Sequence, residues 1–268
     1  MTRLLIAQKE LRGGNYYEKK NVIYRCCFCL CCICFIDPFQ GTVGANFVLN
    51  ELKLKKAAIY VDNSSDYSKG LSAFFKENFV KGGGQIVSEE AYLQKDTDFK
   101  AVLTKIKAAN LEVIYAPGYY EEIGKIVKQA RELGITCPFV GGDGWDSPKM
   151  QEIAGNAALN NTFFTNHYSA DADTPESKAF VAAYEKEYKQ RPDACGVLGY
   201  DGMQLMADAI KRAGAVDSAK ISAALAATKD FKAVTGKTSL NEKHDAVKSA
   251  VIIEFKDGKQ AFRATVNP

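Results

Sequence analysis

From Lys55 onward the chain alternates strand-like and helix-like segments, and this alternation restricts the fold more than any other feature. Short β-branched or aromatic runs predict strands at 55–61, 85–92, 112–116, 138–142 and 162–166. Amphipathic runs predict the helices between them, at 67–81, 98–110, 120–134 and 147–158. Strands in series with helices between them imply a parallel sheet covered on both faces. The predicted fold class is therefore α/β.

The turns that follow three of these strands carry aromatic, hydroxyl and acidic side chains. Because the strands of a parallel sheet point the same way, these turns open at one edge, where α/β proteins usually bind ligands. Each residue alone has an ordinary explanation as a surface residue or helix cap. Together they suit a small cationic or zwitterionic ligand with an apolar tail. The candidate binding residues at this edge are Tyr67, Tyr119, Tyr120, Asp143 and Trp145.

The sequence gives little support for an enzyme. The two histidines, His167 and His244, are far apart, and no serine stands in a nucleophile elbow. No phosphate-binding loop or pair of carboxylates for glycoside chemistry is present. The glycine run 82–84 follows a helix, so it predicts a helix end and not a dinucleotide fingerprint. We predict no catalytic residue and no cofactor, and interpret both histidines as incidental, although His167 lies just beyond a strand end.

Composition excludes one class of partner. A chain of 268 residues can form one large domain or two modest ones. Its formal net charge of +3 is spread thinly, and no basic stripe appears along any predicted helix. Nucleic acid is therefore not expected as a partner.

Cysteines are concentrated near the N-terminus. Six of the eight fall within 26–34, and the other two are Cys137 and Cys195. Closely spaced thiolates can bind soft metals. However, the alternating apolar residues of this run favour a strand, which sends neighbouring side chains to opposite faces. With no histidine, aspartate or second cysteine pair beside it, a hydrophobic strand or an aberrant segment is favoured over a metal site.

The same stretch resembles neither a membrane span nor an export signal. Its uncharged run, 26–36, is about half of the ~20 residues that a spanning helix needs. The sequence "DPFQG" follows where a signal peptide would have a small-residue cleavage site. We therefore predict neither a membrane helix nor a clean secretion signal.

The pattern changes after Asn166. Three helices are predicted with almost no strand between them, at 174–190, 200–214 and 218–228. The C-terminal part predicts strands, with Asp257-Gly258 as a hairpin turn. The three helices have apolar faces that need a further layer to cover them.

Six motifs follow one another in a specific order from about Phe35 onward. They are "CFIDPFQG" (34–41), "DYSKGLSAFF" (66–75), "GYYEEIGKIVKQARELGI" (118–135), "GGDGW" (141–145), "AYEKEYKQRPDA" (183–194) and "YDGMQLMADAI" (200–210). In this order they resemble the leucine/isoleucine/valine-binding proteins of ABC importers, which are periplasmic binding proteins of type I. That resemblance implies two α/β lobes that close on an amino acid.

The resemblance also implies roles for individual residues. Tyr67 and Tyr119 match tyrosines that contact the ligand, and Asp143 matches the acidic residue that meets the ligand's α-ammonium. Tyr120 is expected to pack at the start of its helix. Cys195 stands where relatives often have an aromatic residue, which changes the shape of the side-chain pocket.

The resemblance divides the chain into four parts. Residues 1–36 are an atypical cysteine-rich segment, 37–166 form lobe two, 167–235 are a helical remnant of lobe one, and 236–268 are strands that return to lobe two. The N-terminal part of lobe one is expected to be missing, and with it the donors that hold the ligand's α-carboxylate.

The expected function is non-enzymatic capture of a small amino acid, with a branched-chain one favoured, for delivery to the membrane permease of an ABC importer. The resemblance places such a protein in the periplasm or at the outer face of the cell membrane. Complete members of that family are expected to be monomers. For this chain, association with further copies is kept as an alternative. The alternatives are a sugar- or amide-binding protein of the same fold, or a nicotinamide-dependent enzyme.

Overall fold

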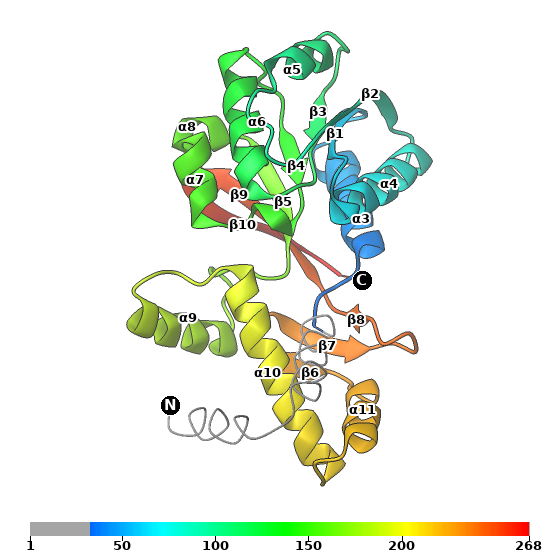
Figure 1. The fold of residues 1–268 in the computed structure, drawn as a ribbon, viewed down its shortest axis with the longest axis vertical. Coiled ribbons are helices and arrows are strands. Elements are labelled where there is room, and N and C mark those ends of the chain that lie inside the picture. Colours follow the sequence, from blue (N-terminus) through cyan, green and yellow to red (C-terminus); the bar gives the residue numbers. More distant parts are fainter. Residues whose placement is uncertain (1–32, 268) are drawn as a thin grey trace.

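A seven-stranded sheet forms the centre of the larger of two lobes in the computed structural model, which describes residues 33–267 (Figure 1). The strand order is β10-β9-β5-β4-β3-β1-β2. The strands are β1 (Lys56–Asp62), β2 (Gln85–Tyr92), β3 (Val113–Tyr115), β4 (Phe139–Gly141), β5 (Thr162–Asn166), β9 (Ala250–Lys256) and β10 (Lys259–Val266). The first five pair in parallel, as the alternating pattern predicts, and β9 pairs antiparallel with both β5 and β10.

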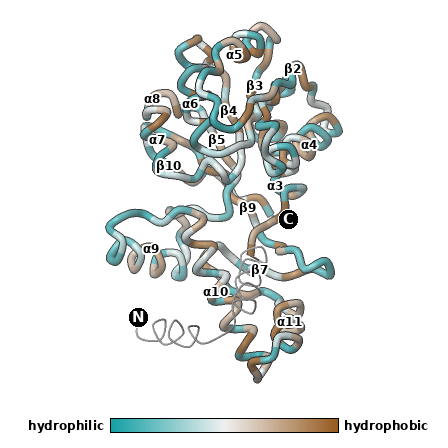
Figure 2. The backbone as a smooth tube through the Cα atoms, in the orientation of Figure 1, coloured by the Kyte–Doolittle hydropathy of each residue, from teal (hydrophilic) through white to brown (hydrophobic). Residues whose placement is uncertain are grey.

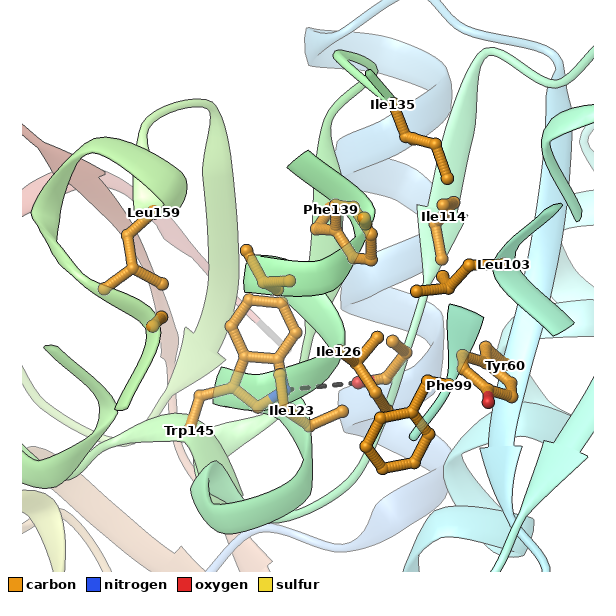
Figure 3. Packing of buried hydrophobic residues seen from close by; sticks show 14 of the residues in the cluster. Tyr60, Phe99, Leu103, Ile114, Ile123, Ile126, Ile135, Phe139, Trp145 and Leu159 are labelled. Carbon is orange, nitrogen blue, oxygen red and sulfur yellow. Dashed lines mark hydrogen bonds between the residues drawn. The ribbon is translucent and has the colours of Figure 1, made fainter. Parts of the chain in front are cut away.

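Helices cover both faces of this sheet, because successive strand residues point to opposite sides. Ala57 and Ile59 of β1 face one apolar cluster, whereas Ala58 and Tyr60 face the other. The first cluster is covered by α3 (Asp37–Asn46), the π-helix η1 (Phe47–Glu51) and α4 (Asp66–Lys81). The second is covered by α5 (Lys100–Lys107), α6 (Tyr120–Glu132), α7 (Pro148–Ala154) and α8 (Asn156–Leu159). Figure 3 shows the second cluster, with Trp145 and Phe139 among its aromatic members.

Local signals start and end these helices close to the predicted positions. Ser147 caps α7 by accepting a hydrogen bond from the Lys149 amide, and Pro148 occupies its first turn. The run predicted as one helix over 147–158 is divided into α7 and α8 at Gly155, whose φ is 79°. A positive φ is costly for other residues, so glycine permits this break.

The smaller lobe contains a sheet of its own, whereas its helices were expected to stand almost without strands. Its helices are α9 (Pro175–Tyr188), α10 (Ala194–Ala213) and α11 (Ser218–Ala226). A three-stranded sheet accompanies them, formed by β6 (Phe231–Ala233), β7 (Gly236–Leu240) and β8 (Ala246–Val247). Hydrophobic residues recur along α10 and α11 as well as along β9 (Figure 2).

The expectation that all strands after residue 236 return to the larger lobe is only half right. Strands β9 and β10 do so, joined at the predicted Asp257-Gly258 turn. Strands β7 and β8 instead pair with each other and with β6, and apolar residues of this sheet pack against Leu198 and Leu205 of α10. The Asp201 carboxylate also accepts hydrogen bonds from the Val234 and Thr235 amides. These contacts with α10 hold the small sheet in place.

Part of the cysteine-rich run lies outside the described residues, because the structure describes the chain only from residue 33. Within 33–267 no helix is long and apolar enough to cross a bilayer. In the same range, no three histidine, cysteine or acidic side chains are grouped so that they could hold a metal ion.

Candidate ligand-binding site

The Asp143 carboxylate is the centre of the predicted edge. Only Gly142 separates Asp143 from the end of β4. Asp143 begins the short 3-10 turn η2 (Asp143–Trp145). Its Oδ1 accepts hydrogen bonds from the Tyr67 hydroxyl at 2.7 Å and from Gln40 Nε2 at 2.8 Å. Its Oδ2 lies 3.1 Å from His167 Nε2. Side chains from α3, from α4 and from the segment after β5 therefore converge on one carboxylate.

His167 is a member of this site, which corrects the interpretation of both histidines as incidental. Its side chain is 2% exposed, whereas that of Asp143 is 26% exposed. The imidazole stacks on the Phe35 ring, with centroids 3.7 Å apart and planes 21° apart. Asp143 therefore has a partner, His167, that can carry a proton. His244 is exposed on a turn of the smaller lobe.

The electrostatics of the site favour a single charge on Asp143. Burial opposes its ionisation, but the hydrogen bond and charge attraction of His167, with hydrogen bonds from Gln40 and Tyr67, outweigh burial and hold the pKa of Asp143 below its usual value. Burial lowers the pKa of His167 despite the attraction of Asp143. Burial, reinforced by Asp143, raises the pKa of Tyr67 well above its usual value. At neutral pH the site therefore combines an anionic carboxylate with a neutral imidazole and a neutral phenol.

A second carboxylate adds to the negative character of this edge. Asp37 is half-buried at the start of α3. Burial and then the charge of Asp143 raise the pKa of Asp37. Two carboxylates near one another favour a ligand that carries a cationic group.

Tyr119 forms an aromatic wall next to Tyr67, as predicted for an edge residue. The two ring centroids are 5.3 Å apart, and the Tyr119 side chain is exposed. Glycines at positions 142 and 144 let the backbone after β4 lie close to the Tyr67 hydroxyl and to the Gly118 carbonyl. A side chain at Gly142 would meet the Tyr67 hydroxyl, and one at Gly144 would meet the Gly118 carbonyl.

Trp145 and Tyr120 lie away from this edge. Trp145 is fully buried, and its Nε1 donates to the Ala116 carbonyl at 3.2 Å, the dashed line in Figure 3. The indole also packs near Phe164, with ring centroids 6.2 Å apart. Tyr120 packs partly buried against the same cluster, as expected for the start of α6. Both residues therefore support the edge from the core.

Cys195 approaches the site from the smaller lobe. It is exposed in the first turn of α10. Burial and the charges of Asp193, Asp143 and Asp146 raise its pKa. Because Asp143 acts on this thiol from the larger lobe, Cys195 lies within electrostatic reach of the predicted site.

Asp146 joins the two lobes beside this site. Its Oδ2 accepts from the Ala194 amide at 2.7 Å and from Asn166 Nδ2 at 3.1 Å. Its Oδ1 accepts from Gln260 Nε2 at 2.9 Å. A pocket of about 210 Å³ opens here, with Asp146 in its lining. The turn that carries Asp143 is thus also the turn that holds the N-terminus of α10.

The sequence did not predict that Gln40 and His167 are hydrogen-bond partners of Asp143. Gln40 lies in the "DPFQG" motif and bridges Asp143 to Thr165 Oγ1, at 2.9 Å from the latter. The available signals were the quoted motif for Gln40 and the strand-end position for His167. Neither signal specifies that these side chains turn toward Asp143.

Comparison with known proteins identifies the family. Residues 31–260 match the periplasmic binding proteins. The chain belongs to this family. The parallel sheet covered on both faces and the two lobes agree with that membership.

Three relatives illustrate the similarity. The Leu/Ile/Val-binding protein BraC3 of Rhizobium johnstonii is 33% identical over 214 residues, which are 79% of this chain and 57% of that protein. The leucine binding protein LivK of Thermotoga maritima has a TM-score of 0.84 and 40% identity, covering 88% of this chain and 67% of that one. The substrate binding protein LivJ of Streptococcus pneumoniae, in complex with isoleucine, has a TM-score of 0.80 and 40% identity, covering 87% and 66%. The chain thus spans little more than half the length of the Rhizobium relative.

Proposed function

We propose that the chain captures a small amino acid without altering it chemically and delivers it to the membrane permease of an ABC importer. Similarity to proteins named for leucine, isoleucine and valine supports a branched-chain amino acid as the ligand. The family supports a location in the periplasm or at the outer face of the cell membrane. In this proposal Tyr67, Tyr119 and Asp143 hold the ligand on the larger lobe.

The observation that carries the proposal is the ionised, partly exposed carboxylate of Asp143. Three donors from the protein hold its pKa below the usual value, and part of its surface stays accessible. A charged hydrogen bond gains strength where water is scarce. Asp143 can therefore pair with an α-ammonium group, while the exposed Tyr119 ring offers an apolar wall beside it. Cys195 would face the ligand from the smaller lobe.

Calorimetry on the full chain tests the proposal. Leucine, isoleucine and valine are titrated first, followed by a panel of sugars and by NAD. We expect heat of binding with at least one branched-chain amino acid and none with NAD. Tight sugar binding without any response to amino acids would reject the proposal in favour of the sugar-binding alternative.

Variants of the site make the test specific. Asp143→Ala removes one partner of a buried charge pair and should weaken amino-acid binding by about 2–5 kcal/mol. Tyr67→Phe removes one hydrogen bond and should cost about 1 kcal/mol. The matched control is Asp173→Ala, because Asp173 is an exposed surface carboxylate that pairs with Lys178. Equal affinity of Asp143→Ala and the control would remove Asp143 from the site.

The nicotinamide-dependent alternative has no supporting observation at this edge. The turn after β1 carries Ser65 as the cap of α4, in place of the glycine-rich turn that holds a pyrophosphate. The acidic pair Asp37 and Asp143 also repels phosphate groups. The amino-acid proposal is therefore preferred.

A further inference from the structure

We propose that His167 is a positioning residue for Asp143, acting as a neutral imidazole with its proton on Nε2. In this role it fixes the carboxylate and leaves one acceptor position on Oδ2 for the cationic group of the ligand. The inference deepens the proposed function and rests on it for the identity of the ligand. The geometry of the imidazole and the carboxylate can be tested without any ligand.

The hydrogen bonds of Asp143 leave room for one further donor. A carboxylate has about four acceptor positions, two on each oxygen. The hydroxyl of Tyr67 and the amide of Gln40 use both positions on Oδ1. His167 uses one position on Oδ2. The remaining position is therefore on Oδ2, the oxygen that His167 holds.

The surroundings of His167 select one protonation state. The ring is 2% exposed and stacks on Phe35. Among the described residues, its Nδ1 is buried without a hydrogen-bond partner. A proton on Nδ1 would have no acceptor there, whereas a proton on Nε2 points at Asp143. The neutral Nε2–H form therefore satisfies the contact that the structure contains.

The charges around the ring agree with that state. Asp143 and Asp146 favour the imidazolium, whereas Lys248 opposes it. Burial is the largest influence, and it lowers the pKa of His167. A neutral His167 leaves the net charge of −1 on Asp143, but a protonated His167 would cancel it. Affinity for a cationic ligand should therefore decrease at the acidic pH where His167 takes up its second proton.

Gln40 braces the carboxylate from the opposite side. Its amide nitrogen donates to both Asp143 Oδ1 and Thr165 Oγ1. With Gln40 on one oxygen and His167 on the other, the carboxylate plane is held against rotation. Removal of either donor should leave the charge in place but let its orientation vary.

Nitrogen NMR on the ¹⁵N-labelled full chain tests the protonation state. The His167 signals are assigned by their loss in His167→Gln. We expect a neutral Nε2–H imidazole at pH 7. A ring protonated on Nδ1, or a fully charged ring at pH 7, would overturn the inference. This result is independent of leucine binding, so it separates failure of the inference from failure of the proposed function.

Two variants test the positioning role. In His167→Gln the side-chain amide nitrogen can replace Nε2, whereas His167→Ala offers no donor. We expect leucine affinity to decrease about 10- to 100-fold in His167→Ala, the range for one hydrogen bond to a charged group. His167→Gln should stay within a few-fold of the wild type and lose the decrease at acidic pH. Equal affinity of His167→Ala and the wild type would overturn the inference.

A ligand-free readout completes the test. Carbon NMR of the Asp143 carboxyl group reports its titration in all three proteins. His167→Ala should raise the pKa of Asp143, because one donor to the charged form is lost, and His167→Gln should restore it. An Asp143 titration that is the same in all three proteins would show that His167 has no effect on the carboxylate, and would overturn the inference even if no protein binds leucine.

Discussion

The two lobes differ in how completely their helices are covered. In the larger lobe, α6 alone contributes four fully buried apolar side chains to the core, Ile123, Ile126, Val127 and Ala130. In the smaller lobe, α11 has no buried residue, and the single buried residue of α9 is Ser177. Large apolar side chains remain exposed there, with Tyr188 and Met203 at 61% and Val216 at 94%. Helices thus form in both lobes, but in the smaller one only α10 buries apolar side chains, whereas α9 and α11 bury none.

The difference shows that an amphipathic pattern specifies a helix but not its partner. A run of aromatic rings, Tyr188, Tyr184, Phe180 and Tyr200, lines one side of a pocket of about 740 Å³ between α9, α10 and β6. The small sheet packs against Leu198 and Leu205 of α10. Since tertiary packing supplies most of the stability of helices in proteins, the smaller lobe should be the less stable one.

Hydrogen exchange on the full chain should show the largest contrast between the lobes. We expect strong protection across residues 55–166 and weak protection across 174–228, because few apolar contacts hold the second range. Slowest-exchanging amides in the two ranges should differ about 100-fold or more in protection, which corresponds to about 3 kcal/mol. Mass spectrometry of peptides from both lobes gives the measurement. Uniform protection would contradict the comparison.

Truncation of one core side chain in each lobe sharpens the contrast. Trp145→Ala should cost about 3–5 kcal/mol of unfolding free energy, since the indole is fully buried. Leu205→Ala, also at a fully buried position, should cost less, because the apolar cluster around Leu205 is much smaller than the one around Trp145. Urea unfolding followed by circular dichroism measures both, because Trp145→Ala removes the single tryptophan fluorophore. A Trp145→Ala variant with unchanged stability would contradict the burial of Trp145 in the core.

The pH dependence of stability gives a smaller effect at the junction of the lobes. Lys248 is 2% exposed between β8 and β9, and its Nζ donates to Thr235 Oγ1. Burial lowers the pKa of Lys248 from 10.5 to about 8, although Asp201 acts in the opposite direction. Between these two pH values the unfolded chain binds more protons than the folded one, so this residue makes stability rise with pH.

A Lys248→Met variant isolates that contribution. Burial raises the pKa of Cys137 to about 11, so folded Cys137 retains a proton above its usual value of 9.0 and opposes the trend. The difference between wild type and variant removes this shared background. Urea unfolding between pH 7.5 and 9.5 should give a steeper rise for the wild type, by up to about 1.4 kcal/mol per pH unit. Parallel curves would show that Lys248 is not perturbed.

The sequence predicts the larger lobe well because its signal is local and periodic. Each strand of the parallel series is a compact apolar run, and each helix has its own stripe. The small sheet was missed because β6 is three residues long and β8 only two. Runs of that length show no period, so pairing with α10 and β7 decides their structure.

The site divides in the same way. That Tyr67, Tyr119 and Asp143 share one edge was predictable, because they follow parallel strands whose carboxyl ends meet there. The burial of Trp145 was not, because the η2 turn determines which way its indole points. Gln40 and Asp143 are 103 residues apart, and no local pattern links them.

By itself, the sequence determined the alternation of strands and helices, the edge at which their turns meet and the carboxylate placed there. Only the tertiary structure decided that His167 and Gln40 hold that carboxylate, that Trp145 is buried in the core and that β7 and β8 stay with the smaller lobe. The physical reason is how far along the chain each kind of interaction acts. Periodicity and caps act within a few residues, whereas hydrogen-bond partners and core contacts are selected by packing between segments far apart in the chain.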